Sequence, residues 1–229
     1  MLGITNTMFD KDPVYSIDVE CIATGRGHND RAVCSVAVVD QNLQVVFERL
    51  VKPALKIHNY LTPITGFTQG DLDCGESLEV VLRDLYTFLP KNSIIIGQAI
   101  DGDLTWLRLQ QGVHFKGRVD LAQEFASQHP VYGSIMYHSL AHTSRVLLGY
   151  ECFESSGSHT AANDAIASMM LYNEYIVTNK IAQAKHILAI ASRPLPSIAK
   201  RMNYRCDDVC MAAYMPRLCF CGAQSKRSC

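Results

Sequence analysis

The stretch VYSIDVE, residues 14–20, places two carboxylates two positions apart in a run that otherwise favours a β-strand. Because side chains along a strand alternate between its two faces, Asp18 and Glu20 share one face. Two neighbouring acids repel each other and resist desolvation unless a cation lies between them, and hard divalent cations such as Mg²⁺ prefer carboxylate oxygens. A half-solvated strand face has the same pattern, so the pair alone leaves a metal site and a surface pair as alternatives.

Around this strand, the pattern predicts an α/β fold with a mixed five-stranded sheet flanked by helices. Two β-rich runs joined by a short polar turn come next, which predicts an antiparallel meander. Helical spacing then alternates with short apolar runs, which favours parallel strands. The further strands are expected at 33–39, 43–50, 93–97 and 118–121, and the helices at 77–89, from about 101, at 139–148 and at 160–178.

Asp103 follows the apolar run 93–97 near the expected start of a helix. The carboxyl ends of strands that lead into helices are where α/β sheets place their sites. Asp101 competes for this role, and an acid at a helix N-terminus is also favoured by the helix dipole. Spacing therefore does not choose between the two aspartates.

His159 and Asp164 lie in SHTAAND, residues 158–164, between a loop rich in Gly and Ser and a predicted helix. The small residues at the start of this helix permit close packing on the sheet, which would bring Asp164 towards the acidic strand. Each of the two residues alone has an ordinary structural interpretation. Their combination with the three acids indicates a site.

Three stretches resemble, in order, the three exonuclease motifs of the DEDDh superfamily. SIDVEC at 16–21 resembles the first motif, GQAIDGDL at 97–104 the second, and HTAANDA at 159–165 the third. TGFT at 65–68 resembles the family's Thr-Gly-Ile-Thr segment. Gln98 and Ala99 depart from the pattern, because many relatives have His-Asn or His-Asp there. The Asp-x-Glu-Cys opening is most similar to the REX-type RNA exonucleases and the related interferon-stimulated exonuclease.

The resemblance implies an RNase H-like fold and a two-metal-ion 3′→5′ exonuclease. Its substrate would be single-stranded RNA or DNA with a free 3′ end, with RNA favoured, and its products nucleoside 5′-monophosphates. A DNA-directed exonuclease and a catalytically idle nucleic-acid-binding module are the alternatives. The implied cofactor is Mg²⁺ or Mn²⁺, two ions per site.

The resemblance also assigns roles to residues. It implies His159 as the general base and, as metal ligands, Asp18, Glu20, Asp103 (in preference to Asp101) and Asp164. The residues expected beside the terminal nucleotide are Cys21, Ile22, Thr65 and Phe67.

Composition places the chain among ordinary globular proteins, with 229 residues of which 48% are hydrophobic and 19% charged. The sequence has no apolar run long enough to cross a membrane and no secretory signal in its first residues, so an intracellular location is expected, the nucleus slightly favoured over the cytoplasm. No membrane partner is expected. Neither a nucleophile-elbow Gly-x-Ser-x-Gly motif nor a P-loop is present, which argues against serine hydrolases and P-loop NTPases.

Charge divides the chain into two expected parts, an exonuclease domain at 1–179 and a basic, cysteine-rich extension at 180–229. Lys and Arg number 12 against 20 Asp and Glu in the first part, and nine against two in the second. An acidic body with a basic extension is the asymmetry expected if carboxylates hold cations while the extension grips a polyanion. A solvated extension or a localisation signal explains the charge equally well.

Five of the nine cysteines lie within residues 206–229. Their spacing, C-x₃-C-x₈-C-x-C, is similar to that of a compact zinc site, although it lacks the paired C-x₂-C of common zinc modules. Unliganded thiols are the alternative. The candidate zinc ligands are Cys206, Cys210, Cys219 and Cys221.

Overall fold

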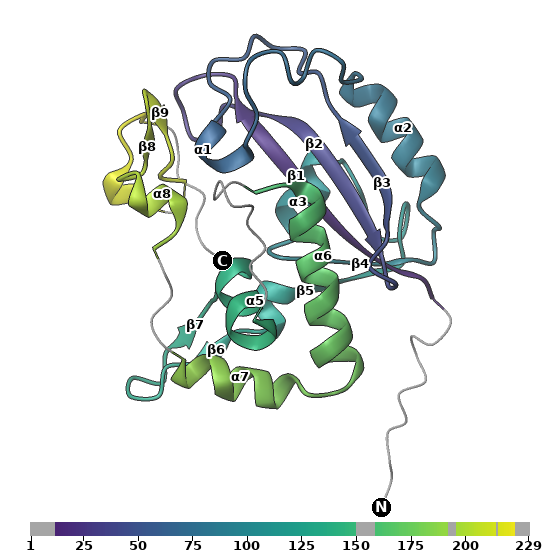
Figure 1. Ribbon diagram of the computed structural model, residues 1–229, viewed down its shortest axis with the longest axis vertical. Helices are drawn as coiled ribbons and strands as arrows, with labels where there is room; N and C mark the ends of the chain where they lie inside the picture. The colour runs from purple at the N-terminus through teal and green to yellow at the C-terminus, as the bar shows by residue number, and fades with distance from the viewer. Residues whose placement is uncertain (1–11, 150–158, 192–195, 214, 223–229) are drawn as a thin grey trace, which may run out of the picture.

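The computed structural model describes residues 12–149, 159–191, 196–213 and 215–222 (Figure 1). Its centre is the predicted five-stranded mixed sheet, with strand order β3-β2-β1-β4-β5. The antiparallel meander consists of β1 (Val14–Ala23), β2 (Arg31–Asp40) and β3 (Val45–Leu50). The two remaining strands, β4 (Ile94–Gly97) and β5 (Gly117–Asp120), continue the sheet in parallel to β1. The α/β fold class is therefore confirmed.

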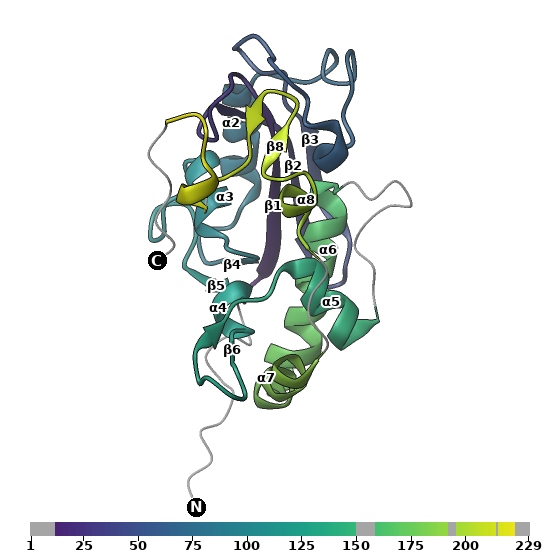
Figure 2. The ribbon, with the colours of Figure 1, turned by 90° about the vertical axis from the view of Figure 1, so that its left-hand side faces the viewer.

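Helices cover both faces of this sheet (Figures 1 and 2). On one face lie α6 (Ala161–Leu171), its π-helical continuation η1 (Tyr172–Val177), α5 (Leu140–Leu148) and α7 (Ile181–Ile190). On the other face lie α2 (Leu78–Phe88) and α3 (Asp101–Trp106). The sheet thus separates two hydrophobic cores, and β4 is apolar throughout because Ile94 and Ile96 enter the α6 core while Ile95 enters the α2 core.

The start of α6 is fixed by a side-chain cap. Thr160 accepts a hydrogen bond from the backbone N–H of Asn163 at 3.2 Å. Ala161 and Ala165 are fully buried, and their small size lets the helix lie close to β1 and β2. The first turn of α6 therefore carries Asp164 up against the acidic strand.

The boundary predicted at residue 180 falls directly before α7, a helix that packs with the helices covering the sheet. α7 belongs to the α6 core, in which Ala184 and Leu188 are buried. The part that stands outside this core is residues 196–222, which we call the C-terminal module. It contains α8 (Ile198–Arg201), the hairpin of β8 (Arg205–Cys206) and β9 (Val209–Cys210), and the 3₁₀-helix η2 (Pro216–Leu218).

The C-terminal module lies beside the short helix α1 (Thr62–Thr65) and the end of β1 (Figures 1 and 2). Cys206 and Val209 pack against Ala23 and Leu61 in a small hydrophobic cluster. The remaining short elements are α4 (Leu121–Glu124) and the hairpin of β6 (Ser127–Gln128) and β7 (Ile135–Met136). Among the residues described, no helix has both the length and the apolar character needed to cross a bilayer.

Candidate active site and a second metal-ligand cluster

Asp18 and Glu20 lie on one face of β1, and the residues between and beside them lie on the other face, which packs against a hydrophobic core. Ile17 is buried in the α2 core, and Val19 and Cys21 pack against that core. The two carboxylates, at the alternate positions, therefore point towards α6. A shift in strand register between Glu20 and Cys21 ends this regular alternation just after the second carboxylate.

Asp164 completes the α6 side of the site and is 8% exposed. Its Oδ2 lies 2.7 Å from Nδ1 of His159. Its Oδ1 is buried and has no hydrogen-bond partner within the part of the chain that the structure describes. A buried carboxylate oxygen without a donor is costly, so this atom is suited to ligate a cation.

Asp103, in α3, lies near the carboxylates of β1 and α6, whereas Asp101, in the same helix, does not. Burial, the largest effect, raises the pKa of Asp103 to about 7; hydrogen bonds from its own backbone and that of Val19 oppose this rise, and the charges of Asp120 and Asp164 add to it. Asp101 instead forms an exposed ion pair with Arg118, with 2.8 Å between its Oδ1 and the arginine Nε. The structure thus separates two aspartates that sequence spacing leaves equivalent.

The close approach of the carboxylates contributes to raised pKa values within the group. Burial, followed by the charges of Asp164, Asp103 and Glu20, raises the pKa of Asp18 well above its ordinary value. Burial and the charge of Asp164 raise the pKa of Glu20 to about 8, against an opposing effect of His159. Such a group of acids, gathered in one partly dehydrated place, fits a divalent cation that would offset the repulsion.

His159 is held at the edge of this carboxylate group. Its backbone N–H donates to the carbonyl of Ile64 in α1 at 2.6 Å, which ties the start of α6 to that helix. Burial lowers the pKa of His159, but the hydrogen bond and charge of Asp164 and the charge of Glu20 outweigh it, so the net shift is upward. Ligand atoms of Glu20, His159 and Asp164 lie within 4.8 Å of one another.

The second motif, in which Gln98 and Ala99 replace the usual residues, is stabilised by its own contacts. Gln98 donates from Nε2 to the carbonyl of His138 at 2.9 Å, and the N–H of Ala99 donates to Oδ1 of Asp120 at 2.9 Å. Ala99 adopts a left-handed φ of 53°. These bonds hold the turn that leads into α3 and hence the position of Asp103.

The four residues expected beside a terminal nucleotide differ in the solvent exposure of their side chains. Ile22 is fully buried with Cys34 and Leu72, so its side chain has no surface for a substrate, which corrects that expectation. Thr65 is 3% exposed, and its hydroxyl donates to the carbonyl of Tyr60 at 2.8 Å. Its side chain therefore stabilises the segment around α1 and has little surface of its own. Cys21 and Phe67 retain partly exposed side chains.

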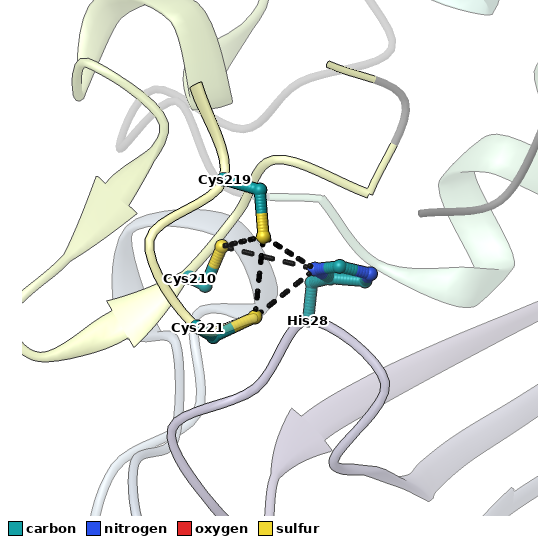
Figure 3. A group of neighbouring side chains, drawn as sticks. All are labelled: His28, Cys210, Cys219 and Cys221. Carbon is teal, nitrogen blue, oxygen red and sulfur yellow. Dashed lines mark hydrogen bonds between the residues drawn. The ribbon is translucent and has the colours of Figure 1, made fainter. Parts of the chain in front are cut away.

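A second cluster of metal-ligand side chains joins the C-terminal module to the loop between β1 and β2. It consists of His28, Cys210, Cys219 and Cys221 (Figure 3). Cys206 is not in it, because its side chain packs with Val209 in the hydrophobic cluster under the module. Of the four cysteines predicted as zinc ligands, the structure thus brings Cys210, Cys219 and Cys221 together with His28, and it places Cys206 apart from them.

Comparisons with known proteins agree with this geometry. A model of the RNase_T exonuclease family matches residues 16–172, a span that contains all four carboxylates and His159. The chain is 29% identical over 176 residues to small RNA degrading nuclease 2 of Arabidopsis thaliana, covering 74% of this chain and 36% of that protein. It is 28% identical over 159 residues to RNA exonuclease 4 of Homo sapiens, covering 69% and 36%.

Among solved structures, the fold is similar to that of the Saccharomyces cerevisiae Pan2 pseudoubiquitin hydrolase–RNA exonuclease module in complex with A7 RNA. The TM-score is 0.61 at 20% identity, over 77% of this chain and 30% of that one. The chain spans about a third of the length of the two curated relatives above.

Proposed function

The chain belongs to the RNase_T exonuclease family, and from this premise we propose that it is a divalent-metal-dependent 3′→5′ exonuclease. It hydrolyses single-stranded nucleic acid from a free 3′ end and releases nucleoside 5′-monophosphates. The observation that carries the proposal is the convergence of Asp18, Glu20, Asp103 and Asp164 from β1, α3 and α6, beside a histidine that is hydrogen-bonded to the last of them.

The four carboxylates are the proposed metal ligands. Bound Mg²⁺ or Mn²⁺, two ions per site, would stabilise both the attacking and the leaving oxygen of phosphodiester hydrolysis. The charges of the three other carboxylates act on Asp18, and a cation bound beside it would offset their repulsion. The unpartnered Oδ1 of Asp164 supports ligation from α6.

His159 is the proposed general base. In the tautomer with a proton on Nδ1, this nitrogen donates to Asp164, which orients the ring, and Nε2 is the proposed acceptor of a proton from the attacking water. The anchor of His159 to Ile64 holds the base beside α1, next to the segment that carries Phe67. Cys21 and Phe67 are the proposed contacts to the terminal nucleotide.

RNA is the proposed preferred substrate. The support is the naming of the relatives, which are an RNA exonuclease and a small RNA degrading nuclease, and the RNA-bound state of the fold neighbour. Exposed lysine and arginine side chains of the C-terminal module add a positive surface near the active site, which suits any nucleic-acid strand. DNA therefore remains the second candidate substrate.

The proposal is tested by digestion of 5′-labelled single-stranded RNA and DNA of the same sequence, with Mg²⁺ or Mn²⁺. We expect a ladder that shortens from the 3′ end, faster for RNA, and that is absent with chelator and in the Asp18→Asn variant. Faster digestion of DNA would reverse the substrate assignment. Binding of both strands without cleavage under either metal would leave a nucleic-acid-binding module and refute the enzyme.

A further inference from the structure

In the second cluster, His28 meets three cysteines that lie more than 180 residues further along the chain. His28 lies between β1 and β2, Cys210 ends β9, and Cys219 and Cys221 follow η2. Figure 3 shows the three sulfur atoms turned towards the imidazole of His28. His28 is 5% exposed and Cys210 is fully buried, so the cluster is closed on the side of the protein interior.

The distances within the cluster fit a tetrahedral ion. The Sγ atoms of Cys219 and Cys221 are 3.4 Å apart, and those of Cys210 and Cys219 are 3.9 Å apart. Nδ1 of His28 lies 3.3, 3.6 and 3.8 Å from the Sγ atoms of Cys221, Cys219 and Cys210. Around a tetrahedral Zn²⁺, metal–ligand bonds of about 2.3 Å to sulfur and about 2.0 Å to nitrogen separate neighbouring ligand atoms by about 3.5–3.8 Å.

Oxidation of the cysteines does not explain this arrangement. A disulfide requires two sulfur atoms about 2.05 Å apart, and both measured sulfur–sulfur distances are far longer. Three thiols with one imidazole nitrogen are a soft donor set that suits zinc. We propose that His28, Cys210, Cys219 and Cys221 bind one Zn²⁺ in a closed structural site, separate from the carboxylate site.

The surroundings favour such a centre. Three thiolates and one neutral imidazole around Zn²⁺ carry one net negative charge, and Arg31 is the cation next to them. Its Nη2 donates to the carbonyl of Cys210 at 2.9 Å, and its Nη1 donates to the carbonyl of Gly27 at 2.8 Å. The N–H of Cys210 donates in turn to the carbonyl of Arg26 at 2.8 Å. These hydrogen bonds hold the loop that carries His28 and the hairpin that carries Cys210 together.

The zinc would join the C-terminal module to the exonuclease fold. The other contacts across this junction include the hydrophobic cluster of Ala23, Leu61, Cys206 and Val209, and surface polar pairs such as Arg26 with Asp208 at 2.8 Å and Asn59 with Asp207 at 2.7 Å. Exposed ion pairs contribute little, and a two-stranded hairpin is marginal alone. Metal binding supplies free energy that such a small unit lacks.

Zinc binding at this junction would also affect the active site. Arg201 is an exposed cation at the end of α8, and the module lies beside α1, whose Ile64 accepts a hydrogen bond from the backbone of His159 (Figures 1 and 2). By fixing the module on the loop at 24–30, the zinc keeps this arginine beside the carboxylate site, where it can meet a phosphate of the substrate. This consequence rests on the proposed function; the zinc site itself does not.

The site is tested by measuring metal content of the purified full chain by mass spectrometry, after expression with zinc under reducing conditions. We expect about one zinc per chain, unchanged in Asp18→Asn, and largely lost in His28→Ala and Cys219→Ala. Cys206→Ala is the matched control, since this thiol lies in the same hairpin but outside the cluster, and it should keep the zinc. His28→Cys should also keep it, because it rebuilds four ligands.

Hydrogen exchange of the same proteins gives a second readout. Loss of zinc should speed exchange of the amides in residues 196–222 while β1, β2 and β4 stay protected, which separates release of the module from global unfolding. Wild-type protein without zinc, or His28→Ala and Cys219→Ala proteins with as much zinc as Cys206→Ala, would overturn the proposal. Neither readout depends on nuclease activity, so a protein that binds zinc but cleaves nothing would refute only the proposed function.

Discussion

Nδ1 of His159 lies 2.7 Å from Oδ2 of Asp164, and the pair spans the start of α6. His159 precedes the cap residue Thr160 and Asp164 lies in the first turn, so the start of this helix places the two residues relative to each other. The same carboxylate raises the pKa of Glu20 and that of Asp18. The helix start therefore couples the proposed base to the proposed metal ligands, and the predictions below follow from that coupling.

Asp103→Asn should abolish most hydrolysis, and Asp101→Asn should not. Asp103 is half-buried beside the other carboxylates, whereas Asp101 pairs with Arg118 at the surface. Metal stabilisation of the reacting oxygens is worth several kcal/mol, so loss of a ligand should lower kcat by more than about 10²-fold. Single-turnover rates of the two variants decide this, and equal rates would show that the carboxylate group is not the metal site.

His159→Ala should lower kcat by about 10²–10⁴-fold and change substrate binding much less, as expected for a general base. The matched control is His186→Ala, on the exposed side of α7. Turnover and binding to a nonhydrolysable strand are measured for both. A variant at position 159 with wild-type turnover would remove the histidine from the mechanism.

The metal-free protein should lose stability as pH rises from about 4 to about 8. The pKa of Glu20 is raised to about 8 and that of Asp103 to about 7, chiefly by burial, while both ionise at about pH 4 in the unfolded chain. Between these values the folded protein holds more protons than the unfolded chain, so stability falls with rising pH. Divalent cations displace these protons, and their affinity should rise over the same range.

Thermal unfolding in chelator and in Mg²⁺, at several pH values, checks this dependence. The melting temperature in chelator should fall with pH, and the increase caused by Mg²⁺ should be largest near pH 8. Glu20→Gln should flatten the dependence in chelator. A melting temperature that rises steadily from pH 5 to pH 8 without metal has the opposite sign and would contradict the account.

Arg201→Ala should move the acidic limb of the kcat/KM profile to higher pH. The charge of Arg201 lowers the pKa of His159, so its removal raises that pKa, and the neutral base is reached only at higher pH. Loss of a phosphate contact should also reduce the slope of log affinity against log salt by about 0.7 for a single strand. Arg217→Ala, an exposed cation of the same module, should leave the pH profile unchanged.

The sheet and the carboxylate group were predictable because local patterns determine them. Alternation in residues 14–20 places Asp18 and Glu20 on one face whatever the rest of the chain does, and the wholly apolar β4 indicates a strand buried on both sides. Spacing alone leaves Asp101 and Asp103 equivalent, whereas the family resemblance favours Asp103. The structure places Asp103 beside the other carboxylates and pairs Asp101 with Arg118.

Two features could not be predicted from local sequence patterns. α7 was assigned to the extension because charge changes at residue 180, yet Ala184 and Leu188 place it in the α6 core. His28 is a single histidine in a loop, and its partners lie 182 to 193 residues further along the chain. Only the docking of the C-terminal module brings them together. The spacing of the cysteines therefore could not indicate that His28, and not Cys206, lies beside the other three.

The most direct test of the central claim follows the fate of the last nucleotide. A single-stranded RNA labelled at its final internucleotide phosphate is incubated with the protein and Mg²⁺, and the labelled product is separated by chromatography. The account predicts labelled nucleoside 5′-monophosphate as the first product, absent with chelator and in Asp164→Asn. Label that first appears in a longer fragment, or in a 3′-monophosphate, would contradict it.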